Sequence, residues 1–319
     1  TATDANRFSI RVARAVTGRP KILFFAASYH GAVDDAMART VDGKTVARPG
    51  LVGQVVDLAV TSKVVEFNDL PALEAALAEG DVAAVLAEPV MTNCCMVLPD
   101  PGYHTALRNL TRKYGTLLII DETHTICTSP GGYTAAYNLE PDMLTIGKPI
   151  AGGVPAAVYG FSEQVAERIR TALSVDHADT GGIGGTLAGN ALSVAAMKAT
   201  LEHVLTQESY DHTIPLAERW TIGVQSVIDA YHLPWHVTQL GCRAEYWFCE
   251  KAPNSGGEAV ASMDDDLDRY MQLAALNRGI LLTPFHNMAL IAPQTTAADI
   301  DRHTEVFRQS VEQLFTPEA

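Results

Sequence analysis

The chain has 319 residues, a net charge of −14 with histidine neutral, and 47% hydrophobic against 19% charged residues. This globular composition excludes a disordered or fibrous chain. The acidic balance argues against binding to nucleic acid or to an anionic membrane surface, because both require clustered Lys and Arg. No apolar run is long enough to span a bilayer, no signal peptide is recognisable, and the five cysteines form no CxxC pair. We therefore expect a cytoplasmic protein with free thiols.

Helices and near-continuous apolar strands alternate along the first half of the chain. The periodicity predicts helices over Asp4–Thr17, Leu70–Ala78 and Pro101–Tyr114. Buried strands are predicted over Lys21–Ala27, Asp81–Ala87, Thr116–Ile120, Met143–Ile146 and Ala156–Tyr159. This alternation is typical of an α/β domain whose largely parallel sheet is covered on both faces.

The pattern changes after residue 186, where long helices are followed by short β-like pieces. Helices are expected over Leu187–Leu205, Leu216–Tyr231 and Ala298–Leu314, with a polar break at Glu208–Thr213 and β-like segments at Ala244–Phe248 and Ile280–Leu282. We therefore place a large domain over residues 1–205 and a small α+β domain over residues 206–319.

Several common motifs are absent from the sequence. A phosphate loop at Lys148 fails, because Asp142 stands where the first glycine belongs and Pro149 follows the lysine. The glycines of Gly181–Gly185 lack the GxGxxG spacing, and neither GxSxG nor HExxH occurs. Histidine and cysteine are scattered without metal-ligand spacing, so no metal site is predicted.

Polar residues follow three of the predicted strands. Glu88 closes one strand, Asp121 the next, and Lys148 comes just after Met143–Ile146. Ligands of open α/β sheets bind beyond the carboxyl ends of the strands, so these side chains are expected to face one crevice. From their positions alone, a structural ion pair between Asp121 and Lys148 is an equally good interpretation.

Six short motifs occur in a characteristic order, and they are Thr1–Asn6, Ser28–Gly31, Glu88–Asn93, Leu118–His124, Thr145–Gly153 and Gly184–Asn190. This series resembles the class III pyridoxal-phosphate-dependent aminotransferases, and within them the branch of glutamate-1-semialdehyde aminomutases and β-amino-acid transaminases. The resemblance implies the aspartate-aminotransferase-like fold type I, with pyridoxal 5′-phosphate (PLP) as cofactor. It also implies a homodimer whose active sites lie at the subunit interface.

The resemblance implies a role for each matching residue. Lys148 is expected to form the Schiff base with PLP and to move a proton in catalysis, and Asp121 to pair with the pyridine nitrogen. Tyr29 should stack on the ring, and Thr186 should reach the phosphate of the partner subunit's cofactor. The full set of expected cofactor-binding residues is Ala2, Thr3, Tyr29, His30, Gly31, Glu88, Asn93, Asp121, His124, Lys148 and Thr186.

The chain departs from the family pattern in three places. His124 stands where the family often has Gln or an apolar residue, near the expected 3-oxygen of the cofactor. Ala2 replaces the usual glycine at the start of the phosphate-binding helix. Family members also carry a substantial segment ahead of the first motif, so we expect that the chain is truncated or begins within the protein.

The resemblance leaves the substrate open. Arg243 and Arg278 are candidates for gripping a substrate carboxylate, although either can equally be a surface or structural arginine. The primary prediction is a transaminase acting on a small-molecule amino donor and an oxo-acid acceptor. The alternatives are an aminomutase or racemase on the same fold, and a truncated non-catalytic module.

Overall fold

A six-stranded sheet forms the centre of the computed structural model, which describes residues 1–172, 181–283 and 286–315. The strands lie in the order β4 (Ser62–Val65), β1 (Lys21–Phe25), β5 (Val82–Ala87), β6 (Leu117–Asp121), β7 (Met143–Ile146) and β8 (Val158–Phe161). The first five run parallel, and β8 pairs antiparallel with β7. The expected α/β fold with a mostly parallel sheet is confirmed.

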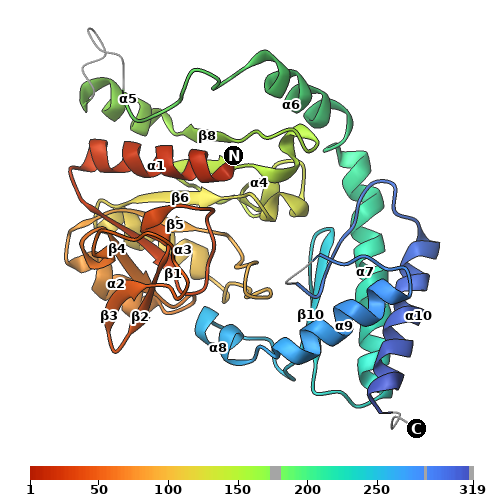
Figure 1. The fold of residues 1–319 in the computed structure, drawn as a ribbon. Helices are drawn as coiled ribbons and strands as arrows, with labels where there is room; N and C mark the ends of the chain where they lie inside the picture. The colour runs from red at the N-terminus through yellow and green to blue at the C-terminus, as the bar shows by residue number, and fades with distance from the viewer. Residues whose placement is uncertain (173–180, 284–285, 316–319) are drawn as a thin grey trace.

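Helices cover both faces of this sheet (Figure 1). One face carries α1 (Ala2–Thr17) and α5 (Glu163–Ala172), and the other carries α2 (Leu70–Ala78) and α3 (Tyr103–Lys113). Every residue of β5 is buried, which explains why its sequence is a continuous apolar run. The parallel direction places the carboxyl ends of β1, β5, β6 and β7 at one edge of the sheet, where polar residues follow them.

Five elements of this part of the chain were absent from the sequence prediction, namely β2 (Ala38–Val41), β3 (Lys44–Ala47), β4, α4 (Gly132–Ala136) and α5. The strand β4 lies at the sheet edge, and β2 pairs with β3 as a small antiparallel hairpin. These segments are short and partly exposed, so they lack the apolar runs that mark the central strands. The short helix α4 follows β6.

The expected break over Glu208–Thr213 is wrong, because α7 runs without interruption over Gln207–Ala230. The backbone N–H of Ser209 donates to the Thr206 hydroxyl at the start of the helix, and the helix continues through Pro215. Tertiary packing outweighs the local polarity here, since one face of α7 is buried from Tyr210 to Ile228. The preceding helix α6 spans Ala191–His203, shorter than predicted at both ends.

The C-terminal part contains a separate antiparallel sheet in the order β11 (Met288–Leu290), β10 (Arg243–Trp247) and β9 (His236–Leu240). It packs with α7, α9 (Asp265–Asn277) and α10 (Ala297–Leu314) around an aromatic core. The short helix α8 (Gly256–Ala261) reaches from this part toward the large sheet, where Gly256 lies close to Ala26 (Figure 1). The predicted strand at Ala244–Phe248 is confirmed as β10, displaced by one residue.

The predicted β-like segment Ile280–Leu282 is wrong, since these residues form a loop after α9. The Leu281 side chain is 81% exposed, so the apolar run does not enter a sheet. The strand lies later, at Met288–Leu290, where Met288 is buried. The division of the chain at residues 205 and 206 stays a prediction. In the part of the chain that the structure describes, no helix is long and apolar enough to cross a membrane.

Candidate active site

A cavity of about 370 Å³ lies at the carboxyl ends of the parallel strands. Its walls come from the start of α1, the turn after β1, the ends of β5 and β6, and the turns on either side of residue 150. The lining residues are Thr1, Ala2, Thr3, Tyr29, His30, Gly31, Glu88, Asp121, Thr123, His124, Lys148, Gly153, Val154, Pro155 and Ala156. Nine of these lining residues are site residues that the sequence predicted.

Four predicted site residues lie outside this lining. Asn93 is half-buried in the loop after β5, and Thr186 is exposed in the turns before α6. Arg278 lies in the C-terminal part, where it donates to Ala274 O and to Gln313 Oε1 at 2.9 and 2.8 Å. Arg243 is buried behind His124 and contacts the cavity wall rather than the cavity. The structure therefore brings together nine of the eleven predicted cofactor residues, and it leaves Asn93, Thr186 and both candidate arginines outside the lining.

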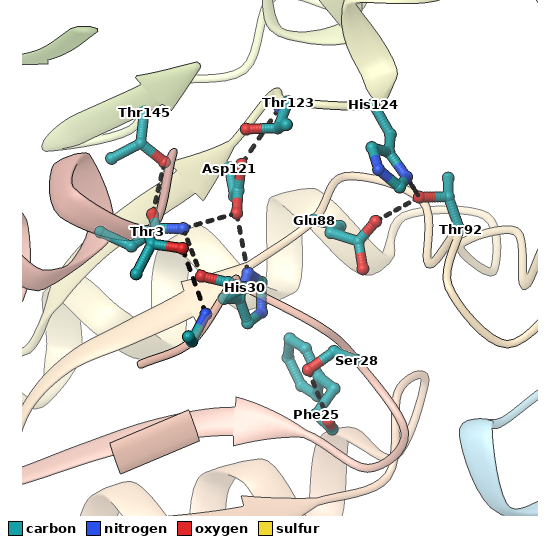
Figure 2. Close-up of polar contacts among 12 residues, drawn as sticks. Thr3, Phe25, Ser28, His30, Glu88, Thr92, Asp121, Thr123, His124 and Thr145 are labelled. Carbon is teal, nitrogen blue, oxygen red and sulfur yellow. Dashed lines mark hydrogen bonds and ion pairs between the residues drawn. The ribbon is translucent and has the colours of Figure 1, made fainter. Parts of the chain in front are cut away.

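Asp121 stands at the end of β6 and is held by three donors (Figure 2). Asn6 Nδ2 donates to Asp121 Oδ2 at 2.9 Å, and His30 Nδ1 contacts the same oxygen at 2.9 Å. The backbone N–H of Thr123 donates to Asp121 Oδ1 at 3.1 Å. The amide of Asn6 is itself oriented, because Oδ1 accepts from Thr145 Oγ1 at 2.7 Å. These contacts fix the direction of the carboxylate at the cavity wall.

The same contacts keep Asp121 ionised although it is buried. Burial by itself would raise the pKa of Asp121, but the contact with His30, assisted by hydrogen bonds from Thr123 and Asn6, lowers this pKa to about 2. A buried carboxylate is therefore available to pair with a protonated ring nitrogen.

Lys148 lines the cavity in the turn after β7. Its backbone has a positive φ of 44°, a conformation that L-residues seldom adopt, so the turn is strained at this lysine. Among the described residues, none forms a hydrogen bond or ion pair with its amine. Partial burial and the charge of Arg243 lower the pKa of Lys148, while the Asp121 carboxylate opposes that shift. The result is an unpaired amine with an increased tendency to be neutral.

The turn after β1 is packed closely against the start of α1. Gly31 has φ of 85°, and a Cβ on Gly31 would lie 2.3 Å from Thr3 Oγ1. Thr3 Oγ1 also accepts from the backbone N–H of Ala32 at 3.1 Å. The chain needs glycine at position 31 for both its conformation and the available space. Tyr29, beside this turn, is 42% exposed at the cavity.

A second polar group lies on the other side of the cavity (Figure 2). The Thr92 hydroxyl is hydrogen-bonded to Glu88 Oε2, and it also lies 2.6 Å from His124 Nδ1. Burial and the charges of Lys148 and Arg243 lower the pKa of His124 to about 3, so the ring is neutral at physiological pH. Burial raises the pKa of Glu88 above its usual range.

Arg243 on β10 connects this group to the C-terminal sheet. Arg243 Nη1 lies 3.3 Å from His124 Nδ1, and Nη2 donates to Thr92 O at 2.6 Å and to Glu245 Oε2 at 2.9 Å. Burial would raise the pKa of Glu245, but His286 and Arg243 lower it, so Glu245 is the anionic partner of this arginine. Arg243 is thus occupied within the protein, which favours the structural interpretation that the sequence left open.

The cavity fits a planar, phosphate-bearing pyridine aldehyde. Three buried polar atoms of lining residues have no partner among the described residues, namely His30 Nε2, Glu88 Oε1 and Thr123 Oγ1. Together with the free amine of Lys148 and the Asp121 carboxylate, they leave donors and acceptors for a polar ring. The start of α1 adds backbone N–H groups suited to a phosphate. In the described part of the chain, no cluster of His, Cys, Asp or Glu has the arrangement of a metal site.

Sequence reasoning missed Asn6, Thr92 and Thr123. Asn6 is fully buried on the apolar face of α1, and a polar residue at such a position was the available signal. Thr92 and Thr123 lie in loops, where a single threonine is usually a turn residue. Nothing in their local sequence indicates contacts with a histidine or a carboxylate far along the chain.

Comparison with known proteins assigns this chain to a family. The aminotransferase class-III family matches residues 1–311. Glutamate-1-semialdehyde 2,1-aminomutase of Desulfitobacterium hafniense strain DCB-2 is 34% identical over 319 residues, covering 98% of this chain and 72% of the relative.

Solved structures agree with this assignment. A glutamate-1-semialdehyde aminomutase from Pseudomonas aeruginosa PAO1 is 49% identical with a TM-score of 0.96, covering 99% of this chain and 71% of that one. A lysine-to-alanine variant from the same organism, in complex with PMP, is 48% identical with a TM-score of 0.95, covering 98% and 70%. An omega-transaminase from Sphaerobacter thermophilus is 26% identical with a TM-score of 0.86, covering 98% and 72%. The chain belongs to the class III aminotransferases, a family of PLP enzymes with fold type I.

Proposed function

We propose that this chain binds PLP in the cavity and moves amino groups with it. Lys148 would hold the aldehyde carbon of the cofactor, and Asp121 would pair with its ring nitrogen. Tyr29 would cover one face of the ring, and the start of α1 at Ala2 and Thr3 would hold the phosphate. The observation that carries this proposal is the free amine of Lys148 in the same cavity as the rigidly held carboxylate of Asp121.

The cofactor, when bound, supplies an electron sink for the carbanion formed at the substrate carbon. The protein supplies the charges and the proton transfers. Asp121 keeps the ring nitrogen protonated, since three donors favour the ionised carboxylate. The amine of Lys148 is suited to accept and return a proton at the substrate carbon, because its lowered pKa increases the neutral fraction.

Within the family, we propose the exchange of an amino group between neighbouring carbons of one molecule. Support comes from the aminomutases, which are 30% or more identical over nearly the whole chain. The substrate class is then a short amino aldehyde such as glutamate 1-semialdehyde, and the product is the isomer that carries the amino group on C1. The alternative is a transaminase. The likeness to an omega-transaminase, at 26% identity, supports this alternative less strongly.

Borohydride trapping tests cofactor binding. PLP is added, the excess removed, the protein reduced, and the labelled peptide mapped. The proposal expects one label on Lys148, and Lys148→Arg should lose it. Lys198, an exposed lysine paired with Glu202 on α6, provides the control, since Lys198→Arg should leave the label unchanged. No label on Lys148, with labels spread over surface lysines, would support a non-catalytic module.

A substrate assay separates the two activities. Glutamate 1-semialdehyde is incubated with the loaded protein without an oxo acid, and the isomer with the amino group on C1 is measured. An aminomutase forms it with no added acceptor, whereas a transaminase needs a separate amino donor and oxo acid. Turnover that depends strictly on an added oxo acid would replace the aminomutase proposal with the transaminase.

We also propose that the active form is a homodimer. Thr186 is exposed and lies outside the cavity of its own chain, which fits a role at the partner's cofactor. Sedimentation of the PLP-loaded protein tests the oligomeric state, and Thr186→Val tests the contact. The expected results are a dimer and weaker PLP binding in the variant. A monomer with full PLP affinity would contradict both.

A further inference from the structure

The hydrogen bonds around Thr92 restrict where the protons of this group can be. Thr92 Oγ1 carries one proton and contacts two atoms that could accept it, Glu88 Oε2 and, at 2.6 Å, His124 Nδ1. Arg243 Nη1 lies 3.3 Å from the same nitrogen, and a guanidinium can only donate. A proton on His124 Nδ1 could be donated to Thr92 Oγ1, but it would then face the N–H that Arg243 Nη1 directs at the same nitrogen. The arginine thus requires that this nitrogen accept.

With Nδ1 as an acceptor, the Thr92 proton has one satisfactory direction. If the hydroxyl donated to Glu88, lone pairs of Thr92 Oγ1 and His124 Nδ1 would face each other at 2.6 Å. If it donates to His124 instead, Thr92 Oγ1 becomes the acceptor of its second contact. The partner atom, Glu88 Oε2, must then carry a proton. The chain of hydrogen bonds is consistent only in this direction.

The surroundings of Glu88 favour the same protonation. The carboxyl group is buried, and Oε1 has no partner among the described residues. Arg243 does not donate to it, since both terminal nitrogens bind His124, Thr92 and Glu245. An ionised Glu88 would be a buried charge with a single hydrogen bond, and such a charge is costly. Burial raises the pKa of Glu88 and Asp121 adds to the shift, and together they outweigh His30, Thr92 and Arg243, which favour the charged form.

We propose that Glu88 is a protonated carboxylic acid that donates to Thr92, and that Thr92 donates to His124 Nδ1. This arrangement holds His124 neutral, with its proton on Nε2. His124 lines the cavity, and Nε2 lies on the ring side away from Thr92 (Figure 2). Glu88, Thr92 and Arg243 are positioning residues, and His124 is the group that presents a neutral N–H donor to whatever oxygen occupies the cavity.

The assignment of protons to Glu88, Thr92 and His124 depends only on contacts within this chain. The role of His124 toward a ligand rests on the proposed function. There, the donor would meet an oxygen substituent of the cofactor ring. A neutral donor holds such an oxygen without adding a positive charge to a site where Lys148 already lines the cavity and Arg243 lies behind its wall. The other titratable groups that face His124 are Asp121 and His286.

Nitrogen NMR of histidine rings tests the assignment in the protein without cofactor. His124 is identified by the signal lost in His124→Gln, or in His124→Asn if the first variant does not fold. Two other histidines are internal references: His104 Nε2 donates to Pro89 O at 2.8 Å, and His236 Nδ1 donates to Cys249 O at 2.7 Å. We expect His124 to match His104 across neutral and mildly acidic pH. A match to His236, or a doubly protonated ring, overturns the proposal.

Infrared difference spectroscopy tests Glu88 directly. The protonated carboxyl band should be present at neutral pH and disappear in Glu88→Gln. Glu245→Gln is the matched control, because it removes a buried carboxyl that is ionised, and the band should persist. The absence of the band in the unsubstituted protein, or its survival in Glu88→Gln, contradicts the proposal.

The Glu88→Gln variant also tests whether a hydrogen-bond donor at position 88 is sufficient to keep His124 in its neutral form. Its amide can donate to Thr92 as the acid does, so His124 should keep its Nε2 proton. Addition of PLP to the labelled protein then tests the ligand role, which predicts a shift of the Nε2 signal with Nδ1 little changed. If PLP binds and the Nε2 signal does not move, His124 has no role toward the ligand, while the proton assignment still holds. If PLP does not bind, the proposed function is contradicted instead.

Discussion

Asn6 and Asp121 are 115 positions apart in the sequence, yet their side chains meet at 2.9 Å beneath the cavity. The amide of Asn6 has a single consistent orientation, because Oδ1 accepts from Thr145 while Nδ2 donates to both Asp121 and His30 O. Helix α1 thus fixes a carboxylate at the end of β6. Buried polar groups that are fully satisfied in this way specify one geometry.

Replacement of Asn6 should weaken both the fold and the site. Asn6→Leu removes a donor from Asp121 and leaves the buried Thr145 hydroxyl without its acceptor, a loss of about 1–3 kcal/mol. Ser9→Ala on the same helix is the control, since the buried Ser9 hydroxyl has no partner among the described residues. Denaturant unfolding and PLP titration of both variants check this expectation. Equal stability and PLP affinity in the two variants would contradict it.

Gly31→Ala should disturb the cavity as well as the backbone. The added Cβ would lie 2.3 Å from Thr3 Oγ1 and 3.0 Å from Thr3 Cα, so the start of α1 must move. Gly18→Ala has a similarly positive φ, of 69°, but meets nothing within 4 Å. Both variants should lose about 1 kcal/mol from backbone strain, and Gly31→Ala should lose more. We expect weaker PLP binding in Gly31→Ala alone, measured by absorbance titration.

Tyr29 should contribute through its ring rather than its hydroxyl. Among the described residues, none forms a hydrogen bond with that hydroxyl, and the ring is exposed at the cavity. Tyr29→Phe should therefore retain PLP affinity, while Tyr29→Ala should weaken it by about 1 kcal/mol, the usual contribution of an aromatic contact. A larger loss in the Phe variant than in the Ala variant would indicate a role for the hydroxyl.

His303 should make the C-terminal core sensitive to acid. Its ring is buried near Trp220 and Phe307, and burial lowers the pKa of His303 to about 4 from 6.5. The folded state favours the neutral ring, so this contribution is complete above pH 6.5 and is lost as the pH falls toward 4. Relative to His303→Phe, the protein should lose about 3 kcal/mol of unfolding free energy over that interval.

Unfolding free energies at several pH values check this prediction. His203→Gln, at the exposed end of α6, controls for the removal of a histidine elsewhere. A difference between the protein and His303→Phe that does not change with pH would show that the buried ring imposes no acid sensitivity.

The sequence predicted best where one physical signal dominates. The segments Leu70–Ala78 and Met143–Ile146 have the predicted bounds, because their apolar patterns are compact and end at clear boundaries. Glu88, Asp121 and Lys148 could be placed at one edge because parallel strands end together. The resemblance then added residues such as Thr3 and Gly31, whose neighbours no local pattern reveals.

The errors have a common origin in long-range contacts. The polar start of α7 is helical because the face from Tyr210 onward packs against the C-terminal core. The sequence left Arg243 open as a substrate contact or a structural arginine. The contact that favours the structural role joins Arg243 to Thr92 O across 151 positions, so no local pattern reveals it. Side chains that meet only after folding leave no periodicity to detect, and only the assembled structure identifies them.

The backbone of the lysine turn also depends on the first helix. A Cβ on Gly147 would lie 2.9 Å from the methyl group of Ala2 and 3.2 Å from the Ala2 backbone nitrogen, so alanine at position 2 requires glycine at position 147. Alanine at position 2, where the family usually has glycine, therefore fits because residue 147 has no side chain. The residues at positions 2 and 147 should consequently be coupled in evolution, and a lineage with alanine at position 2 would be constrained to keep glycine at position 147.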